Sequence, residues 1–134
     1  MINQKYYAYG SNMDAEQMLK RCPQSIFQEK ATLLGYQFFI NKRGYASIRK
    51  KKNSQVWGII YNISVSDEAS LDRYEGYPKI YGKLDLPELK AFCYIDLTPE
   101  EGLPKTGYLE KIIKSSQLHS FPKEYIAELK SWLK

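Results

Sequence analysis

The sequence is poor in the residues that build metal centres and disulfide frameworks, and it has no long apolar run. Its 134 residues include one histidine and two cysteines, Cys22 and Cys93. Because these residues are scattered along the chain, they make neither a recognisable zinc set nor a disulfide framework. No apolar run approaches the ~20 residues of a membrane-spanning helix, and residues 1–6 lack the apolar core of a secretion signal. We therefore expect a cytoplasmic protein with reduced thiols, no metal and no membrane partner.

What the sequence does contain is the composition of a globular protein, with an excess of tyrosine and of positive charge. Hydrophobic residues make up 43% and charged residues 26%, which argues against wholesale disorder. Twelve residues are tyrosines, and 20 Lys and Arg against 15 Asp and Glu give a net charge of +5. The length suffices for one sizeable core. Since no linker, low-complexity tract or repeat interrupts it, we expect residues 1–134 to form a single domain.

Hydrophobic patterning predicts a mixture of strands and helices. Runs rich in aromatic and β-branched residues predict strands at 5–9, 31–41, 45–49, 56–61, 81–86 and 91–97. Helical spacing predicts helices at about 14–21 and 66–76, followed by a helical tail. The tail carries two apolar stripes, which comprise Tyr108, Leu109, Ile112 and Ile113, and then Phe121, Tyr125, Leu129 and Trp132. This order predicts an α+β fold whose short antiparallel strands curl into a barrel.

Turn and capping residues predict how these elements connect. Asn53 is the expected positive-φ residue of a hairpin that joins strands 45–49 and 56–61. Gly35 is expected to form a bulge or bend within its strand. Ser11 or Asn12 is expected to cap the first helix, and Ser66 opens the second.

The segment at residues 9–12, Tyr-Gly-Ser-Asn, is the first candidate site. A strand ends there, Gly10 allows a tight turn, and a helix follows. Unpaired backbone N–H groups at such a point favour an anion. The alternative interpretation is a plain strand-to-helix turn.

Glu75 is the second candidate, at the end of a short predicted helix. Tyr74 and Tyr77 flank it, and Gly76 lets the backbone turn. A carboxyl in an aromatic pocket has its pKa raised by desolvation, as a general base that works near neutrality requires. The alternative is an ordinary surface glutamate at a helix end.

Other candidates favour structural interpretations. The basic run at residues 49–52 could bind single-stranded nucleic acid together with the tyrosines. However, it falls on a predicted hairpin tip and no RNA-recognition signature accompanies it, so we expect no nucleic-acid partner. His119 is expected to lie between the last two helices, and Cys93 in a buried strand. We expect Tyr36, Tyr61 and Tyr94 to be half-buried sheet residues rather than ligand contacts.

Several motifs together resemble one family. The N-terminal YYAYGSNM at residues 6–13 resembles the aromatic-Ala-Tyr-Gly-Ser-Asn-Leu signature of the γ-glutamylcyclotransferase (AIG2-like) family. VWGIIY at 56–61 and LDRYEG at 71–76 look like its Val-Trp-Gly and Leu-Asp-x-x-Glu-Gly segments. GYLEKII at 107–113 and FPKEY at 121–125 are similar to its C-terminal segments. The motifs occur in family order, so the resemblance covers nearly the whole chain.

The resemblance implies a small mixed β-barrel with flanking helices, and an enzyme that releases 5-oxoproline from a small γ-glutamyl compound without a cofactor or metal. It implies that Glu75 is the catalytic residue. It also implies that the substrate is bound by Ala8, Tyr9, Gly10, Ser11, Asn12 and Tyr108. Tyr9, Tyr74, Tyr77 and Tyr108 would line a dry pocket around the carboxylate. The chain would be a monomer or a homodimer.

Two departures from the family pattern concern substrate choice. Residues 114–116 read Lys-Ser-Ser where the family often has Gly-Ala, and residues 78–81 differ from the best-known members. Two alternatives stay open: a relative that acts on γ-glutamylamines or carrier-bound substrates, and a non-catalytic barrel that binds a small anion or a protein.

Overall fold

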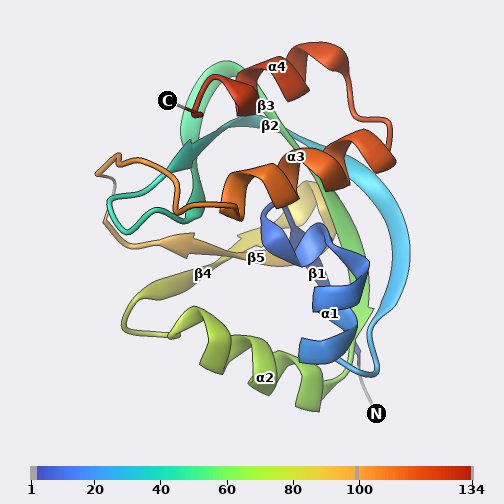
Figure 1. Cartoon of the computed structure of the whole chain (residues 1–134). Helices are drawn as coiled ribbons and strands as arrows, with labels where there is room; N and C mark the ends of the chain where they lie inside the picture. Colours follow the sequence, from blue (N-terminus) through green and yellow to red (C-terminus); the bar gives the residue numbers. More distant parts are fainter. Residues whose placement is uncertain (1–2, 99, 134) are drawn as a thin grey trace.

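The computed structural model describes residues 3–98 and 100–133, and it contains one five-stranded sheet with helices at both ends (Figure 1). The sheet order is β2-β3-β1-β5-β4. The strands are β1 (Gln4–Ala8), β2 (Ile26–Ile40), β3 (Ala46–Ile63), β4 (Tyr81–Leu86) and β5 (Ala91–Asp96). The helices are α1 (Ala15–Arg21), α2 (Val65–Glu75), α3 (Tyr108–Leu118) and α4 (Lys123–Lys130), with short 3-10 turns η1 (Ser11–Met13) and η2 (Pro87–Leu89).

The predicted α+β class is confirmed, and the sheet is a barrel only in a loose sense. β1 pairs with β5 in parallel, whereas the other neighbouring strands pair antiparallel. The sheet is strongly curved but open, with β2 and β4 at its two ends. In Figure 1 the long strands β2 and β3 arch around α3 and α4, and α2 lies at the opposite end of the molecule.

The predicted hairpin around residues 50–54 is wrong. β3 runs through this segment without reversing and pairs with β2 along most of its length, so that the hairpin turn lies at residues 41–45 instead. Asn53 does have a positive φ of 65° and Gly35 one of 82°. The register of β2 against β3 shifts between Leu34 and Tyr36, so Gly35 and Asn53 lie in an irregularity of two paired strands. An irregularity of this kind bends the strands that contain it. A positive-φ Asn is common to turns and bulges, so the sequence did not distinguish them.

The predicted helices form, with different caps from those expected. Asp14 rather than Ser11 or Asn12 caps α1, because its side chain accepts from the backbone N–H of Gln17 at 2.9 Å. Ser64 rather than Ser66 caps α2, where it forms a reciprocal capping box with Asp67. The start of α1 therefore lies one 3-10 turn beyond the predicted anion-binding loop.

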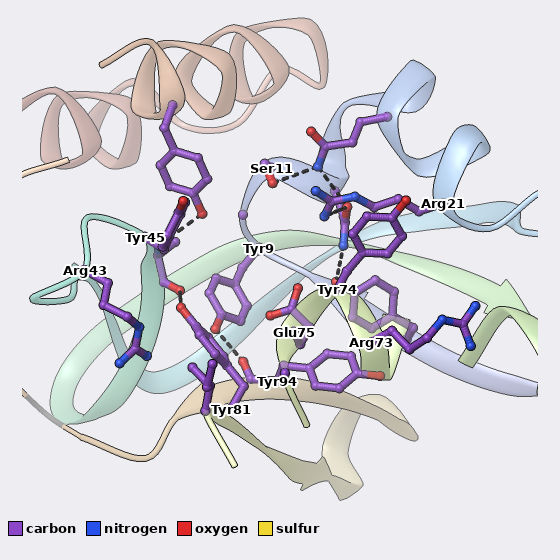
Figure 2. A pocket seen from close by; sticks show the side chains of 18 residues that line it. Tyr9, Ser11, Arg21, Arg43, Tyr45, Arg73, Tyr74, Glu75, Tyr81 and Tyr94 are labelled. Carbon is purple, nitrogen blue, oxygen red and sulfur yellow. Dashed lines mark hydrogen bonds between the residues drawn. The ribbon is translucent and has the colours of Figure 1, made fainter. Parts of the chain in front are cut away.

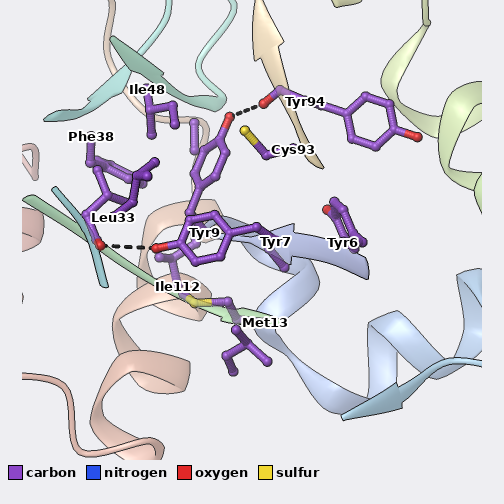
Figure 3. Packing of buried hydrophobic residues seen from close by; sticks show 14 of the residues in the cluster. Tyr6, Tyr7, Tyr9, Met13, Leu33, Phe38, Ile48, Cys93, Tyr94 and Ile112 are labelled. Carbon is purple, nitrogen blue, oxygen red and sulfur yellow. Dashed lines mark hydrogen bonds between the residues drawn. The ribbon is translucent and has the colours of Figure 1, made fainter. Parts of the chain in front are cut away.

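The core lies between the curved sheet and the C-terminal helices (Figure 3). The two apolar stripes predicted in the tail pack there, and Cys93 is fully buried in β5 as expected. Tyr7 is fully buried too, and its hydroxyl donates to the carbonyls of Ala31 and Val56, each at 3.0 Å. Gly58 faces it so closely that a Cβ there would lie 2.5 Å from the Ala8 carbonyl oxygen. Glycine at position 58 therefore allows β3 to pack closely against the end of β1, just before the loop that follows this strand.

Candidate functional site

A pocket of about 450 Å³ opens where the loop after β1, the end of α2 and the start of α3 meet (Figure 2). Its walls are mainly tyrosines and arginines. The lining residues are Tyr6, Tyr9, Gly10, Ser11, Asn12, Gln17, Arg21, Arg43, Tyr45, Ala46, Arg73, Tyr74, Glu75, Gly76, Ile80, Tyr81, Tyr94 and Tyr108. Among these residues Glu75 is the single carboxylate, and three arginines accompany it. The pocket therefore suits an anionic ligand.

Glu75 is the last residue of α2, and its half-buried side chain points into the pocket. Gly76 follows it in the left-handed conformation, with a φ of 67°, and ends the helix. Burial raises the pKa of the Glu75 carboxyl to about 7, and the positive charge of Arg21 acts in the opposite direction. A carboxyl with this pKa both accepts and releases a proton near neutrality.

A polar cluster ties α2 to the sheet and so fixes the position of Glu75. The Tyr94 hydroxyl donates to Asp72 at 2.6 Å. The Lys83 ammonium lies between two acids of α2, 2.6 Å from Glu68 and 3.1 Å from Asp72. These bonds join the helix to β4 and β5 one turn before the carboxyl of Glu75.

The loop at residues 9–12 forms the opposite wall. Met13 N–H donates to the Gly10 carbonyl at 3.1 Å, which closes the 3-10 turn. Gly10 lies beside the Tyr108 hydroxyl, which a Cβ at this position would meet at an ordinary contact distance of 3.4 Å. Asn12 is buried, and its Nδ2 donates to the Tyr6 hydroxyl at 3.0 Å.

Tyr108 and Tyr81 both line the pocket, and their hydroxyls bond to the backbone of the same residue, Ala46. The backbone N–H of Ala46 donates to the Tyr108 hydroxyl at 3.0 Å, and the Tyr81 hydroxyl donates to the carbonyl of the same residue at 2.9 Å. Asn41 donates to the Tyr81 hydroxyl and to Asp96, at 2.9 and 2.7 Å. Asp96 in turn pairs with Arg43 at 2.8 Å, which holds this guanidinium at the pocket wall.

The structure brings together nearly all the residues that the sequence singled out. Glu75, Tyr9, Gly10, Ser11, Asn12 and Tyr108 all line the pocket. Ala8 does not, because it is buried in β1 opposite Ile59. Of the two tyrosines that flank Glu75, Tyr74 lines the pocket with 58% of its surface exposed, whereas Tyr77 lies outside the lining and packs on Lys83.

The sequence missed several residues of the pocket wall. We expected Tyr94 to be a sheet residue without a ligand contact, but it lines the pocket from β5. Arg21 and Arg43 carried no motif that singled them out. Arg21 lies over the Tyr74 ring at 4.3 Å. Only its spacing of four residues from Gln17, which places both on one face of α1, could have indicated it.

The residues with other expected roles lie away from the pocket. His119 ends α3 and stacks on Phe27, with ring centroids 5.7 Å apart. Cys22 and Cys93 are buried free thiols whose pKa burial raises to about 12. Within residues 3–98 and 100–133, no group of three or more acidic, histidine or cysteine side chains could hold a metal ion. In the same residues no helix is long and apolar enough to cross a membrane.

Comparisons with known proteins point to one family. The family described as "Gamma-glutamyl cyclotransferase, AIG2-like" matches residues 6–111. A mouse gamma-glutamylcyclotransferase is 26% identical over 144 aligned positions, which cover 94% of this chain and 77% of the mouse protein. A solved gamma-glutamyl cyclotransferase superposes with a TM-score of 0.87 at 24% identity, covering 97% of this chain and 88% of that one. An uncharacterised human protein of known crystal structure superposes with a TM-score of 0.79 at 27% identity, covering 96% and 87%.

Proposed function

The chain belongs to the gamma-glutamyl cyclotransferase, AIG2-like family, and we propose that its pocket releases 5-oxoproline from a γ-glutamyl substrate with Glu75 as the base and acid. The observation that carries the proposal is the half-buried carboxyl of Glu75, whose pKa burial raises to about 7, in a pocket lined mainly by tyrosines and arginines. The catalytic and binding roles proposed below rest on this carboxyl and on the family motifs around it.

The reaction is intramolecular, so positioning supplies much of the rate. The α-nitrogen of the substrate attacks its own γ-carbonyl carbon, the new C–N bond closes a five-membered lactam, and the old C–N bond to the leaving group breaks. Holding the chain in this attack geometry can contribute ~7–11 kcal/mol. The enzyme therefore needs a pocket that folds the substrate and a group that moves protons.

Glu75 supplies the proton transfers. Two protons leave the α-ammonium and two arrive on the departing nitrogen, and one carboxyl that alternates between base and acid carries them in turn. A pKa near 7 suits both directions of transfer. The backbone N–H groups of Gly10 to Asn12 would hold the substrate carboxylate or the developing oxyanion, with Tyr108 beside them.

The charge of the pocket favours a leaving group that carries a carboxylate. Arg21, Arg43 and Arg73 line the pocket with Glu75. Asp96 pairs with Arg43, whereas no ion pair within residues 3–98 and 100–133 engages Arg21 or Arg73, so the lining keeps an excess of positive charge. A free amine at the end of the leaving group would bring a positive charge to this wall. We therefore expect γ-glutamyl amino acids, whose leaving group carries a carboxylate, to be better substrates than γ-glutamylamines, whose leaving group carries none.

The test is release of 5-oxoproline from both substrate classes by the wild type, Glu75→Gln and a matched control. We expect Glu75→Gln to lose about 10²–10⁴-fold in kcat. The control, Glu110→Gln, makes the same change at an exposed position in the first turn of α3 and should keep full activity. Full turnover by Glu75→Gln would contradict the role of this residue, and a wild type silent on both classes would contradict the activity.

A further inference from the structure

Two cations that can only donate hydrogen bonds lie at the edge of the loop formed by residues 10–13. Lys111 of α3 donates to Gln17 Oε1 at 2.8 Å. Arg21 donates to Asn12 Oδ1 at 3.1 Å. Neither cation has an acceptor to offer, so each amide must turn its oxygen toward its cation and its NH₂ group away. The orientations of Gln17 and Asn12 are therefore fixed by charge.

The orientation of Gln17 decides the role of the Ser11 hydroxyl. Gln17 Nε2 donates to Ser11 Oγ at 2.8 Å and to Asn12 Oδ1 at 2.9 Å. Ser11 Oγ is thus an acceptor in this bond, and its own hydrogen is not spent on Gln17. Tyr108 lines the same pocket as Ser11, and its hydroxyl accepts from the Ala46 N–H. No hydrogen bond within the described residues uses the hydrogen of either hydroxyl, so both hydrogens are left for the pocket.

The orientation of Asn12 acts on Tyr6 in the same way. Because Asn12 Oδ1 receives both Gln17 and Arg21, its Nδ2 donates to the Tyr6 hydroxyl at 3.0 Å. The Tyr6 oxygen is an acceptor, and no hydrogen bond within the described residues uses its hydrogen. The Tyr81 hydroxyl of the same pocket differs, since it donates to the Ala46 carbonyl.

We infer that Gln17, turned by Lys111, is a positioning residue that directs the hydroxyl hydrogen of Ser11 into the pocket, where it binds an anionic oxygen of the substrate. Asn12, turned by Arg21, does the same for the hydrogen of Tyr6. This inference rests on the proposed function, because the anionic ligand is the γ-glutamyl substrate. Gln17 acts through other side chains, so its effect is on the direction of their bonds.

Two substitutions of Gln17 separate direction from mere support. Gln17→Glu keeps the shape and the contact with Lys111 but can only accept at Ser11, so that the Ser11 hydrogen turns away from the pocket. Gln17→Met removes the bond and leaves the Ser11 hydroxyl free to turn. We expect KM to rise about tenfold in Gln17→Glu and less than about threefold in Gln17→Met, with kcat within about twofold in both. A purely supporting role predicts the reverse order, because glutamate keeps the bonds to Lys111 and Ser11 that methionine loses.

A Ser11→Ala background controls for the added charge. If Gln17 acts through Ser11, the gap in KM between Gln17→Glu and Gln17→Met should narrow to about twofold there. Thermal unfolding of each variant shows that the fold is retained. An equal or larger KM for Gln17→Met, or a gap that persists in the Ser11→Ala background, overturns the inference while wild-type activity still supports the proposed function. A wild type that releases no 5-oxoproline contradicts the proposed function itself.

Discussion

Tyr6 and Tyr7 are neighbours in β1, yet their hydroxyls serve two regions of the molecule in opposite ways. Tyr7 lies in the core and donates its hydrogen to the carbonyls of Ala31 and Val56. Tyr6 lies at the pocket and accepts from Asn12, so its hydrogen is left for a ligand. Both residues are buried, since Tyr7 is 0% exposed and Tyr6 is 5% exposed. Burial therefore does not distinguish these two tyrosines, whereas the direction of their hydrogen bonds does.

The largest effect on stability is expected on the core side, at Gly58. A Cβ there would lie 2.5 Å from the Ala8 carbonyl oxygen and 2.8 Å from Tyr7 Cζ. Because backbone and a packed ring cannot both move aside, Gly58→Ala should lower the free energy of unfolding by about 3 kcal/mol. Gln55→Ala, at an exposed position of the same strand, is the control and should change it by less than about 0.5 kcal/mol. Urea unfolding measures both, and a stable Gly58→Ala variant would contradict the close packing of β1 on β3.

On the pocket side the sign reverses, because Glu75 costs stability when it is charged. The folded state raises the pKa of this carboxyl from 4.5 to about 7, so the folded chain binds the proton more tightly than the unfolded chain. Stability therefore falls as pH rises from about 4.5 to 7, by at most about 3 kcal/mol. Glu75→Gln should match the wild type near pH 4 and exceed it at pH 8. Denaturant unfolding at the two pH values tests this, and a difference that does not change with pH would contradict the raised pKa.

The same protonation should appear in the kinetics of the wild type. If the base form of Glu75 starts the reaction, kcat/KM should rise about tenfold for each pH unit below its pKa and level off above about pH 7. Initial rates of 5-oxoproline release from pH 5 to pH 8 give the profile. A profile that is flat across pH 7 would show that another group limits the reaction.

A matched pair of single-oxygen deletions tests the comparison directly. Tyr7→Phe should cost about 1 kcal/mol of stability and leave kcat/KM within about twofold, because its hydroxyl serves only the fold. Tyr6→Phe should cost a similar amount, since Asn12 Nδ2 loses its acceptor, and should also lower kcat/KM about tenfold. Unfolding curves and initial rates for the two variants suffice. Equal kinetic effects would remove the distinction between the two tyrosines.

The smallest effect is expected outside both regions. Lys50, Lys51 and Lys52 are exposed in the bend of β3, away from the pocket lining. Replacing the three by glutamine should change stability by less than about 0.5 kcal/mol per residue and leave kcat/KM unchanged at 0.15 M salt. Initial rates and unfolding curves serve again. A large kinetic loss would show that this basic run contributes to the substrate field.

Local patterns sufficed for elements whose signal lies within a few residues. Apolar spacing indicated α3 and α4, and the aromatic runs indicated the strands. The β2–β3 hairpin was misplaced because a positive-φ Asn fits a turn and a bulge equally well, and only the pairing partner of each residue decides between them. In the same way, several oxygen-bearing side chains near each helix start could serve as its cap, and the tertiary path selected Asp14 and Ser64.

For the site, local motifs indicated the residues that surround one carboxyl, since Glu75 and residues 9–12 belong to recognisable segments. The fold then brought Arg43 and Tyr94 to the same pocket from distant elements, and neither residue carries a local signal. It also decided the pKa of Glu75, since desolvation depends on what packs around a group. The excess of tyrosine was visible in the composition. Which tyrosines keep a hydrogen for the pocket was not, because a hydroxyl either donates or accepts according to the partner that the fold brings to it.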